Sequence, residues 1–369
     1  MSKKFKKVKG IEIGDGSRIK KIEGVSTSNT VFIGLSEKGT LNKPEKITSF
    51  EDFQDIFGGF SEDQLLAYNV DGFFKNGGTL CYVIRVENIG IAEIDDALSS
   101  LEKIEVNIIA IPDNRGSIEV IKEVIEFCEN DGNYFYIIEP PVGLEPDEII
   151  NFKDINGLNS SFAALYYPNI YINAPEMEEQ FLIQPSGFIA GIYSRTDSRR
   201  GVWKAPAGRD VEIIGATGLE IDPSESELGS LNNENINPLR SYQDKVIPWG
   251  GKTLEKGTEL KYIATKRLIM YIKKSIYKGS QWAIFEPNDE KLWAKLRTLA
   301  FDFLTKVWRD GALHGSRPQE AFFVKCDRET NTENVINRGK VRIELGIAIS
   351  KPAEFTRINI EVFAGKDKK

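Results

Sequence analysis

Phe355-Thr-Arg-Ile-Asn-Ile-Glu-Val-Phe363 is the stretch of sequence from which our interpretation of the fold starts. Its apolar residues Ile358, Ile360 and Val362 are separated by single polar residues, which is the two-residue period of a β-strand. A charged tail, Gly365-Lys-Asp-Lys-Lys369, follows it. A strand in this position can leave its own domain and pair with the sheet of another chain. We therefore expect this strand to link copies of the chain to one another.

The sequence just upstream has the pattern of an α+β domain. Leu268, Ile272 and Ile276 form the apolar stripe of an amphipathic helix that ends at Gly279. The expected elements are helices over residues 262–277 and from Asn288 or Asp289 to Gly311, and strands over residues 281–285, 321–326 and 340–349.

Further upstream, apolar strands alternate with helices. Strand patterns occupy residues 30–35, 81–86, 108–111, 134–138 and 163–167, and helical patterns occupy 50–57, 62–74, 119–129, 148–152 and 185–192. This order predicts an α/β sandwich-type body, with a parallel sheet and helices packed on its faces. We expect residues 195–210, which are rich in charge, glycine and proline, to form an ordered loop.

Charge divides the chain into parts. Residues 1–21 carry eight Lys/Arg and two Asp/Glu, residues 22–240 carry 15 and 37, and residues 241–369 carry 25 and 16. We expect an N-terminal arm (1–24) with a short strand around Ile11 and Ile13, an acidic body (25–240), a basic C-terminal domain (241–350) and a C-terminal arm strand with its tail (351–369). The basic parts would face an acidic partner.

Metal and cofactor chemistry finds little support in the sequence. The cysteines Cys81, Cys128 and Cys326 are far apart, and His314 is the only histidine, so the closely spaced ligands of a zinc site are missing. No complete phosphate-binding glycine motif is present. We expect no cofactor, no metal, and three buried, reduced thiols.

Candidate catalytic side chains are few. His314 follows a helix end and is interpreted as a turn residue. Asp113, Glu139, Asp197 and Asp210 lie near strand ends or in loops, where paired carboxylates could transfer protons. In a chain with 55 acidic residues we interpret them as solvated surface groups.

Targeting signals are also missing from the sequence. No apolar run approaches the roughly 18–20 residues that span a bilayer, and no signal-peptide core follows the Lys-rich start. We expect the chain to be made and kept in the cytoplasm, without membrane insertion, and we expect no nucleic acid partner because no known nucleic-acid module is present.

Three blocks of sequence resemble the contractile tail sheath family, which includes phage tail sheaths and the sheaths of R-type bacteriocins and extracellular contractile injection systems. The first block comprises residues 23–39 and 73–86, and the second comprises residues 185–197 and 200–208, including Arg200-Gly-Val-Trp-Lys-Ala-Pro-Ala-Gly208. The third comprises Trp249-Gly250, Gln281-Trp-Ala-Ile-Phe-Glu-Pro-Asn-Asp289, residues 321–332 and Lys351-Pro-Ala-Glu-Phe355. The chain departs from the family at Lys9-Gly10-Ile11, where a proline is usual.

The resemblance implies a structural protein and not an enzyme. Sheath subunits assemble in a bacterial cell as stacked, hexameric rings around an inner tube, with baseplate and terminator proteins at the ends, and become part of a virion or a released or anchored particle. Contraction drives the tube through a target envelope. Terminal arms add strands to the C-terminal sheets of neighbours; Ile11, Ile13, Phe355, Ile358, Ile360 and Val362 are the candidates here. Arg309 and Arg317 are the candidates for facing the tube.

Two alternatives stay open at this point. One is another structural component of the same machine, such as a tube or baseplate protein, although the two-domain plan and the Pro352-Ala-Glu-Phe355 segment argue against it. The other is a soluble α/β hydrolase or nucleotide enzyme, which the absent motifs disfavour.

Overall fold

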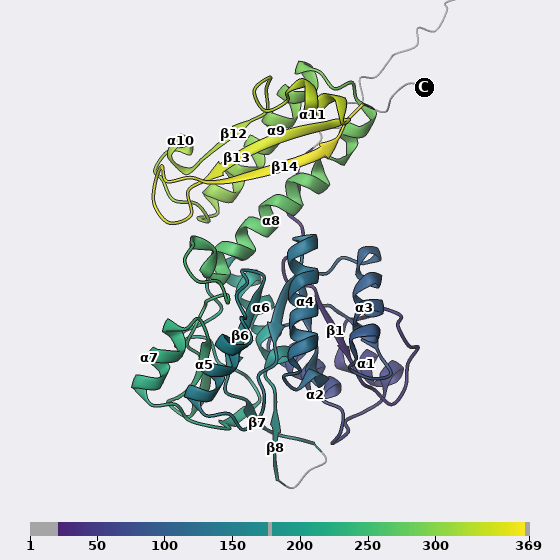
Figure 1. The fold of residues 1–369 in the computed structure, drawn as a ribbon, viewed down its shortest axis with the longest axis vertical. Helices are drawn as coiled ribbons and strands as arrows, with labels where there is room; N and C mark the ends of the chain where they lie inside the picture. The colour runs from purple at the N-terminus through teal and green to yellow at the C-terminus, as the bar shows by residue number, and fades with distance from the viewer. Residues whose placement is uncertain (1–20, 176–178, 366–369) are drawn as a thin grey trace, which may run out of the picture.

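The computed structural model describes residues 21–175 and 179–365 of the chain. They form two parts, a large α/β body and a smaller α+β domain, which are joined by the long helix α8 (Ile263–Gly279) (Figure 1). The predicted combination of an α/β body with a C-terminal α+β domain is confirmed.

The body is built on an eight-stranded sheet with strand order β11-β10-β6-β5-β4-β1-β3-β2. Its strands are β1 (Thr30–Gly34), β2 (Glu45–Ile47), β3 (Cys81–Arg85), β4 (Ile108–Ala110), β5 (Phe135–Ile138), β6 (Ala163–Tyr167), β10 (Asn237–Tyr242) and β11 (Lys245–Pro248). The six central strands are parallel, and the edge strands β2 and β11 are antiparallel to their neighbours. The central strands are buried on both sides, which explains their nearly continuous apolar sequence.

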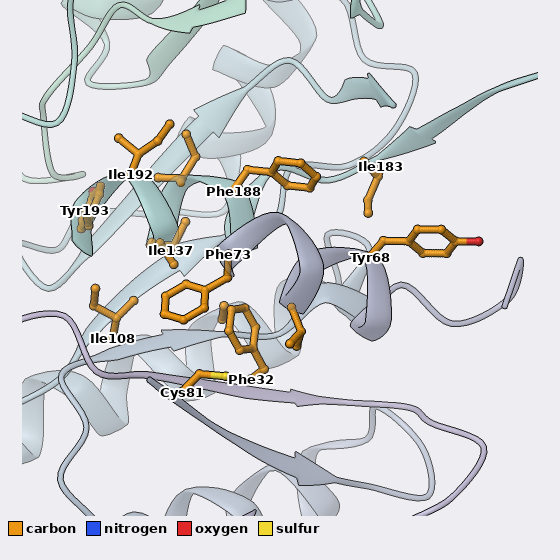
Figure 2. Packing of buried hydrophobic residues seen from close by; sticks show 14 of the residues in the cluster. Phe32, Tyr68, Phe73, Cys81, Ile108, Ile137, Ile183, Phe188, Ile192 and Tyr193 are labelled. Carbon is orange, nitrogen blue, oxygen red and sulfur yellow. The ribbon is translucent and has the colours of Figure 1, made fainter. Parts of the chain in front are cut away.

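Helices cover both faces of this sheet. One face packs against α1 (Phe50–Phe57), α2 (Leu66–Lys75) and α6 (Ser186–Arg200), and the other against α3 (Ile91–Ser99), α4 (Ile118–Asp131), α5 (Pro146–Ile155) and α7 (Glu225–Asn233). The hydrophobic core on the first face includes Phe73 of α2, whose ring centre lies 5.5 Å from that of Phe32 in β1 (Figure 2). Helices α2 and α6 approach closely, since a Cβ on Gly187 would lie 2.2 Å from the backbone oxygen of Asn69.

Smaller elements complete the body. A second sheet has the order β8-β7-β9 and contains β7 (Ile170–Asn173), β8 (Gln180–Ile183) and β9 (Ala216–Leu219). Short 3₁₀ turns occur at Ser100–Lys103, Pro112–Asn114, Glu259–Lys261 and Gln281–Phe285.

The C-terminal domain packs a three-stranded antiparallel sheet on helices. Its order is β12-β13-β14, with β12 (Phe322–Lys325), β13 (Lys340–Ile347) and β14 (Thr356–Phe363). The sheet packs on α8 and on α9 (Glu290–Arg309). The short helix α10 (Pro318–Ala321) directly precedes β12, and α11 (Glu333–Asn337) lies between β12 and β13 in sequence. The Asp289 side chain accepts the backbone N–H groups of Lys291 and Leu292, as expected for the N-cap of α9.

Four local predictions were wrong. Residues 281–285 form a 3₁₀ turn and not a strand, and the helix expected over 62–74 begins at Leu66. Helix α6 continues to Arg200, so the first six residues of the expected loop over 195–210 are helical, because residues 186–194 and Thr196 are buried in the body. The body sheet extends past residue 240, because β10 and β11 form a hairpin at its edge. None of the described helices is long and apolar enough to cross a membrane.

Candidate assembly surfaces

Strand β14, the strand expected to link copies, pairs along its whole length with β13 of the same chain. The eight residue pairs run from Lys340↔Phe363 to Ile347↔Thr356. From the sequence we expect the strand that pairs with residues 355–363 to lie within residues 321–326 or 340–349, and β13 lies in the second of these ranges. In the single chain, however, both strands belong to one copy.

The two faces of β14 differ sharply. Ile358, Ile360 and Val362 are buried in the core of the C-terminal domain. On the opposite face, Glu361 accepts hydrogen bonds from Arg342 at 2.6 Å and from Lys340 at 3.0 Å. Hydrogen bonds to these two cations hold the pKa of Glu361 below its usual range. The strand therefore has one fully apolar face, and the hydrogen bonds of Glu361 with Lys340 and Arg342 favour one alignment on β13.

The connection between β13 and β14 is long for adjacent antiparallel strands. It comprises residues 348–355, whereas hairpin loops usually have about two to five residues. The backbone N–H of Ala353 donates to the Glu320 oxygen at 2.8 Å, and the Phe355 ring packs edge-on against Phe323, with 5.3 Å between the ring centres. Ala353 has a positive φ of 63°, a backbone conformation that costs a residue with a Cβ some stability. The connection is thus anchored near both ends, at Ala348 and at Phe355, and through Ser350 and Ala353 between them.

Both edges of the C-terminal sheet are unpaired within the described ranges. Strand β12 forms one edge and β14 the other, and neither has a second neighbouring strand. An edge strand presents backbone N–H and C=O groups that can pair with an added strand. The domain therefore has room for strands from outside.

The N-terminal arm residues Ile11 and Ile13 lie outside the described residues. The segment that follows the arm runs along α8 in the opposite direction. The Val25 N–H donates to Ser275 Oγ at 3.1 Å, and Arg267 donates to the Thr27 oxygen at 3.0 Å. A Cβ on Gly24 would lie 2.1 Å from the Tyr271 hydroxyl, so this path is tight. The root of the arm is therefore fixed to the helix that joins the two parts.

A buried ion pair holds this junction. Arg267 of α8 donates to both carboxylate oxygens of Asp197 on α6, at 3.0 and 2.6 Å, and its guanidinium lies 4.5 Å from the ring centre of Tyr193. Thr27 Oγ1 donates to the same carboxylate at 2.5 Å. The sequence does not predict this pair, although a cation beside the apolar stripe of α8 is a signal that could have pointed to Arg267.

The candidate tube-facing residues lie on one exposed stretch. Arg309 is the last residue of α9 and Arg317 is the N-cap of α10, and both side chains are exposed. Arg309 also lines a groove of 580 Å³ along α9, together with Ile22 and the exposed ring of Phe301. The loop between them is held by the Trp308 indole N–H, which donates to the Gly315 oxygen at 2.9 Å.

The carboxylates proposed as surface groups are mostly buried, so that interpretation was wrong. Only Asp210 is exposed; Asp113, Glu139 and the side chain of Asp197 are buried. Asp113 accepts the N–H groups of Leu35 and Leu65, at 2.9 and 2.8 Å, and Glu139 accepts the Ser186 hydroxyl. These two acids lie at the carboxyl ends of β4 and β5, where they accept hydrogen bonds from N–H and hydroxyl groups of the same chain.

Other chemistry expected or excluded from the sequence can be located in the structure. His314 is an exposed turn residue whose N–H donates to the Ala348 oxygen at 2.8 Å. The three cysteines are free and buried, and burial raises the pKa of each thiol. Across residues 21–175 and 179–365, no three His, Cys, Asp or Glu side chains gather in a way that could hold a metal ion.

Comparison with known families identifies both parts of the chain. Residues 87–254 match the phage tail sheath protein central domain, and residues 255–363 match the phage tail sheath C-terminal domain. The tail sheath protein of Enterobacteria phage T4 is 24% identical over 234 residues, which cover 60% of this chain and 35% of that protein. The chain spans 30–45% of the length of the curated tail sheath proteins that it matches.

Solved structures extend this similarity over nearly the whole chain. The contracted helical sheath of the anti-feeding prophage is 25% identical, with a TM-score of 0.79, and the match covers 95% of this chain and 98% of that one. A chain of the six-fold symmetrised anti-feeding prophage baseplate is 27% identical with a TM-score of 0.77, at the same coverage. The resemblance to sheath proteins predicted from the sequence is confirmed.

Proposed function

Since the chain belongs to the phage tail sheath family, we propose that it is the structural subunit of a contractile sheath. The subunits assemble as stacked, hexameric rings around an inner tube, with a baseplate at one end and terminator proteins at the other. Contraction of the sheath drives the tube through a target envelope. The subunit acts by changing its packing and not by catalysis, and it assembles in the bacterial cytoplasm.

The pairing of β14 with β13 carries this proposal. All the contacts of β14 that are described above can form equally well when the strand comes from another copy, because they depend only on the side chains of the sheet. The eight-residue connection decides which chain supplies the strand. Opening it converts the closed single chain into a chain that donates its strand and receives one, as in strand exchange. This contact is heterologous, so it propagates into a helical array.

The arms then keep the array connected during contraction. The arm strand around Ile11 and Ile13 would add to a neighbouring C-terminal sheet, whose edges are unpaired within the described ranges. The root of the arm is fixed to α8 through Val25 and Thr27. A donated strand stays paired while the body rotates, so rings can approach one another without separating.

The charge distribution suggests the orientation of the subunit. Residues 241–369 carry more basic than acidic residues, and residues 22–240 carry a large acidic excess. We place the C-terminal domain against the tube and the body outward, with Arg309 and Arg317 nearest the tube. Replacing both arginines by glutamate should reduce co-sedimentation of sheath with tube protein while sheath self-assembly is retained, and unchanged co-sedimentation would contradict this orientation.

Cross-linking tests the strand exchange. Glu344 and Asn359 are directly paired between β13 and β14, and their side chains share the outer face of the sheet. In a Glu344→Cys/Asn359→Cys variant, oxidation before assembly should give a cross-linked monomer. Oxidation after assembly should give a ladder of covalent oligomers on non-reducing gels. The native thiols are buried, and the two single variants are the controls.

The outcomes separate the two levels of the proposal. Cross-linked monomers from assembled cylinders would show that β14 stays within its own chain and would remove the exchange. Protein that remains monomeric in electron micrographs, with and without tube protein, would remove the sheath function itself. Closed rings of tube diameter that form without an inner tube would favour a tube or baseplate protein instead.

A further inference from the structure

An open groove with aromatic walls lies at the β11 edge of the body. It has a volume of 360 Å³, and its floor is made of small residues, including Ala205, Ala207 and Gly251. Trp249 and Tyr262 line it, and Tyr262 is 42% exposed. The loop that carries Ala205 and Ala207 is tied to β11 by the Gly208 N–H, which donates to the Pro248 oxygen at 2.9 Å. The groove is therefore a fixed feature of the fold.

Cations without carboxylate partners surround this groove. Lys204 and Arg209 flank the small residues in sequence, and Lys252 and Lys261 lie beside the two aromatic residues. None of these four side chains forms an ion pair with any residue that the structure describes, whereas nearby Lys245 and Lys256 do. Burial and the neighbouring charge of Lys261 lower the pKa of Lys252. Lys252 and Lys261 thus repel each other, in a body that is otherwise acidic.

The opposite situation occurs on the outer face of α3 and α4. These two helices contain eight carboxylates and one lysine. None of the eight forms an ion pair within the described ranges. Asp95 of α3 lies beside Glu123 of α4, and burial followed by the charge of Asp95 raises the pKa of Glu123. Glu126, the next carboxylate on α4, adds to this repulsion. We call this surface the α3–α4 acidic face.

The two surfaces lie toward different edges of the body sheet. The groove adjoins β11, the first strand of the order, and α3 follows β3, which is next to the last strand. Two separate surfaces of one rigid body can meet only between different copies. Such a contact is heterologous, which is the type that builds rings and helices.

On these observations we propose that the basic groove receives the α3–α4 acidic face of a neighbouring copy. This contact rests on the proposed sheath function and adds a body-to-body interface to the strand exchange between C-terminal domains. Each surface relieves the like-charge repulsion of the other, and the exposed ring of Tyr262 with the partly buried ring of Trp249 supplies an apolar centre inside a charged rim. Because the rim is exposed, the contact orients the bodies and speeds their association more than it adds affinity.

Charge reversal and exchange test the proposal. Lys204→Glu/Arg209→Glu cancels the net charge of the four groove cations, and Asp95→Lys/Glu126→Lys lowers the net charge of α3 and α4 from −7 to −3. Each double variant should lower the yield of cylinders in electron micrographs about tenfold or more, because the attraction across the contact is then lost or halved. The chain that carries all four substitutions should assemble better than either double variant, since its new carboxylates can pair with its new ammonium groups. Lys38→Glu/Lys46→Glu, at exposed lysines of another region, is the matched control and should assemble normally.

Mixing each double variant with wild-type chain gives a second test, because each of the two surfaces can then be supplied by a different copy. Each reversed variant still presents one wild-type surface, so it should join the ends of wild-type cylinders and block their growth. If the groove variant fails but the acidic-face variant assembles normally, the groove binds something else and the proposal is overturned. Normal assembly of both double variants overturns it as well. The wild-type chain must form cylinders in the same experiment; if it does not, the sheath function fails and not this contact alone.

Circular dichroism before assembly checks that every variant is folded. All four substituted side chains are exposed, so the folded state should be retained. The variant with all four substitutions could also be folded but assemble no better than the two double variants. This result would mean that the two surfaces do not meet each other, and it too would overturn the proposal.

Discussion

Arg267 and Asp197 form an ion pair that is almost completely sealed from solvent, with side chains that are 4% and 5% exposed. The pair joins α8 to α6, and the same arginine donates to the Thr27 oxygen at the root of the N-terminal arm. Force applied to the arm therefore reaches the helix that connects the body to the C-terminal domain. One buried arginine thus ties the arm root and α6 of the body to α8.

Breaking this pair from one side should be costly. Arg267→Met leaves the buried Asp197 carboxylate without its cation, and Asp197→Leu leaves a buried guanidinium without its anion. Each should lower the free energy of unfolding by about 3–5 kcal/mol. Urea unfolding of the unassembled chain, followed by tryptophan fluorescence, measures the change.

The double variant is the control for this prediction. Arg267→Met/Asp197→Leu removes both charges, so it should lose much less than the two single variants together. Additive losses would mean that the two side chains stabilise the junction independently of their pairing.

The apolar face of β14 makes a second prediction. Ile360→Ala removes buried atoms from the C-terminal core and should cost about 2–5 kcal/mol of unfolding free energy. Asn359→Ala, on the exposed face of the same strand, should change the free energy by less than about 0.5 kcal/mol. If the strand is exchanged, the same ranking should appear in the urea resistance of assembled cylinders. Equal sensitivity of the two variants would mean that β14 does not supply the core.

Much of the fold follows from the sequence because its signals are local. The apolar runs of the central strands and the stripe of α8 predicted elements that the structure confirms within a few residues. The strand prediction for residues 281–285 was wrong because their apolar side chains pack a 3₁₀ turn beside α8 and do not reflect strand pairing. The burial of Asp113 and Glu139 was missed because backbone N–H groups and a hydroxyl distant in sequence satisfy them. The groove likewise combines loops that only the hairpin of β10 and β11 brings together.

Lys266 offers a third prediction. It is buried under the ring of Phe162, and burial lowers its pKa to about 8. Because the folded state favours the neutral amine, Lys266 costs stability at neutral pH, and this cost disappears as the pH rises from about 8 to the unfolded value of 10.5. Lys266→Met should stabilise the chain by up to about 3 kcal/mol at neutral pH and have little effect near pH 10.5. Lys273→Met, at an exposed position on the same helix, should show no such trend in thermal melts.

Glu139 makes the opposite prediction for pH. The carboxyl group is fully buried at the end of β5, its Oε1 accepts the Ser186 hydroxyl, and its Oε2 has no hydrogen-bond partner among the described residues. Burial, with a further contribution from the charge of Asp113, raises its pKa well above 4.5. The folded state therefore keeps a proton that the unfolded state releases above about pH 4.5.

The stability that Glu139 contributes is thus complete at low pH and is lost as the pH rises. Glu139→Gln keeps the shape and cannot ionise, so its advantage over the wild-type chain should grow with pH, by up to about 1.4 kcal/mol per pH unit, until the folded pKa is reached. Urea titrations of both chains from about pH 5 to about pH 8 measure this difference. Glu119→Gln, at an exposed site on α4, is the control and should run parallel to the wild type. A constant difference between Glu139→Gln and the wild type over this range would mean that Glu139 is already ionised in the folded body.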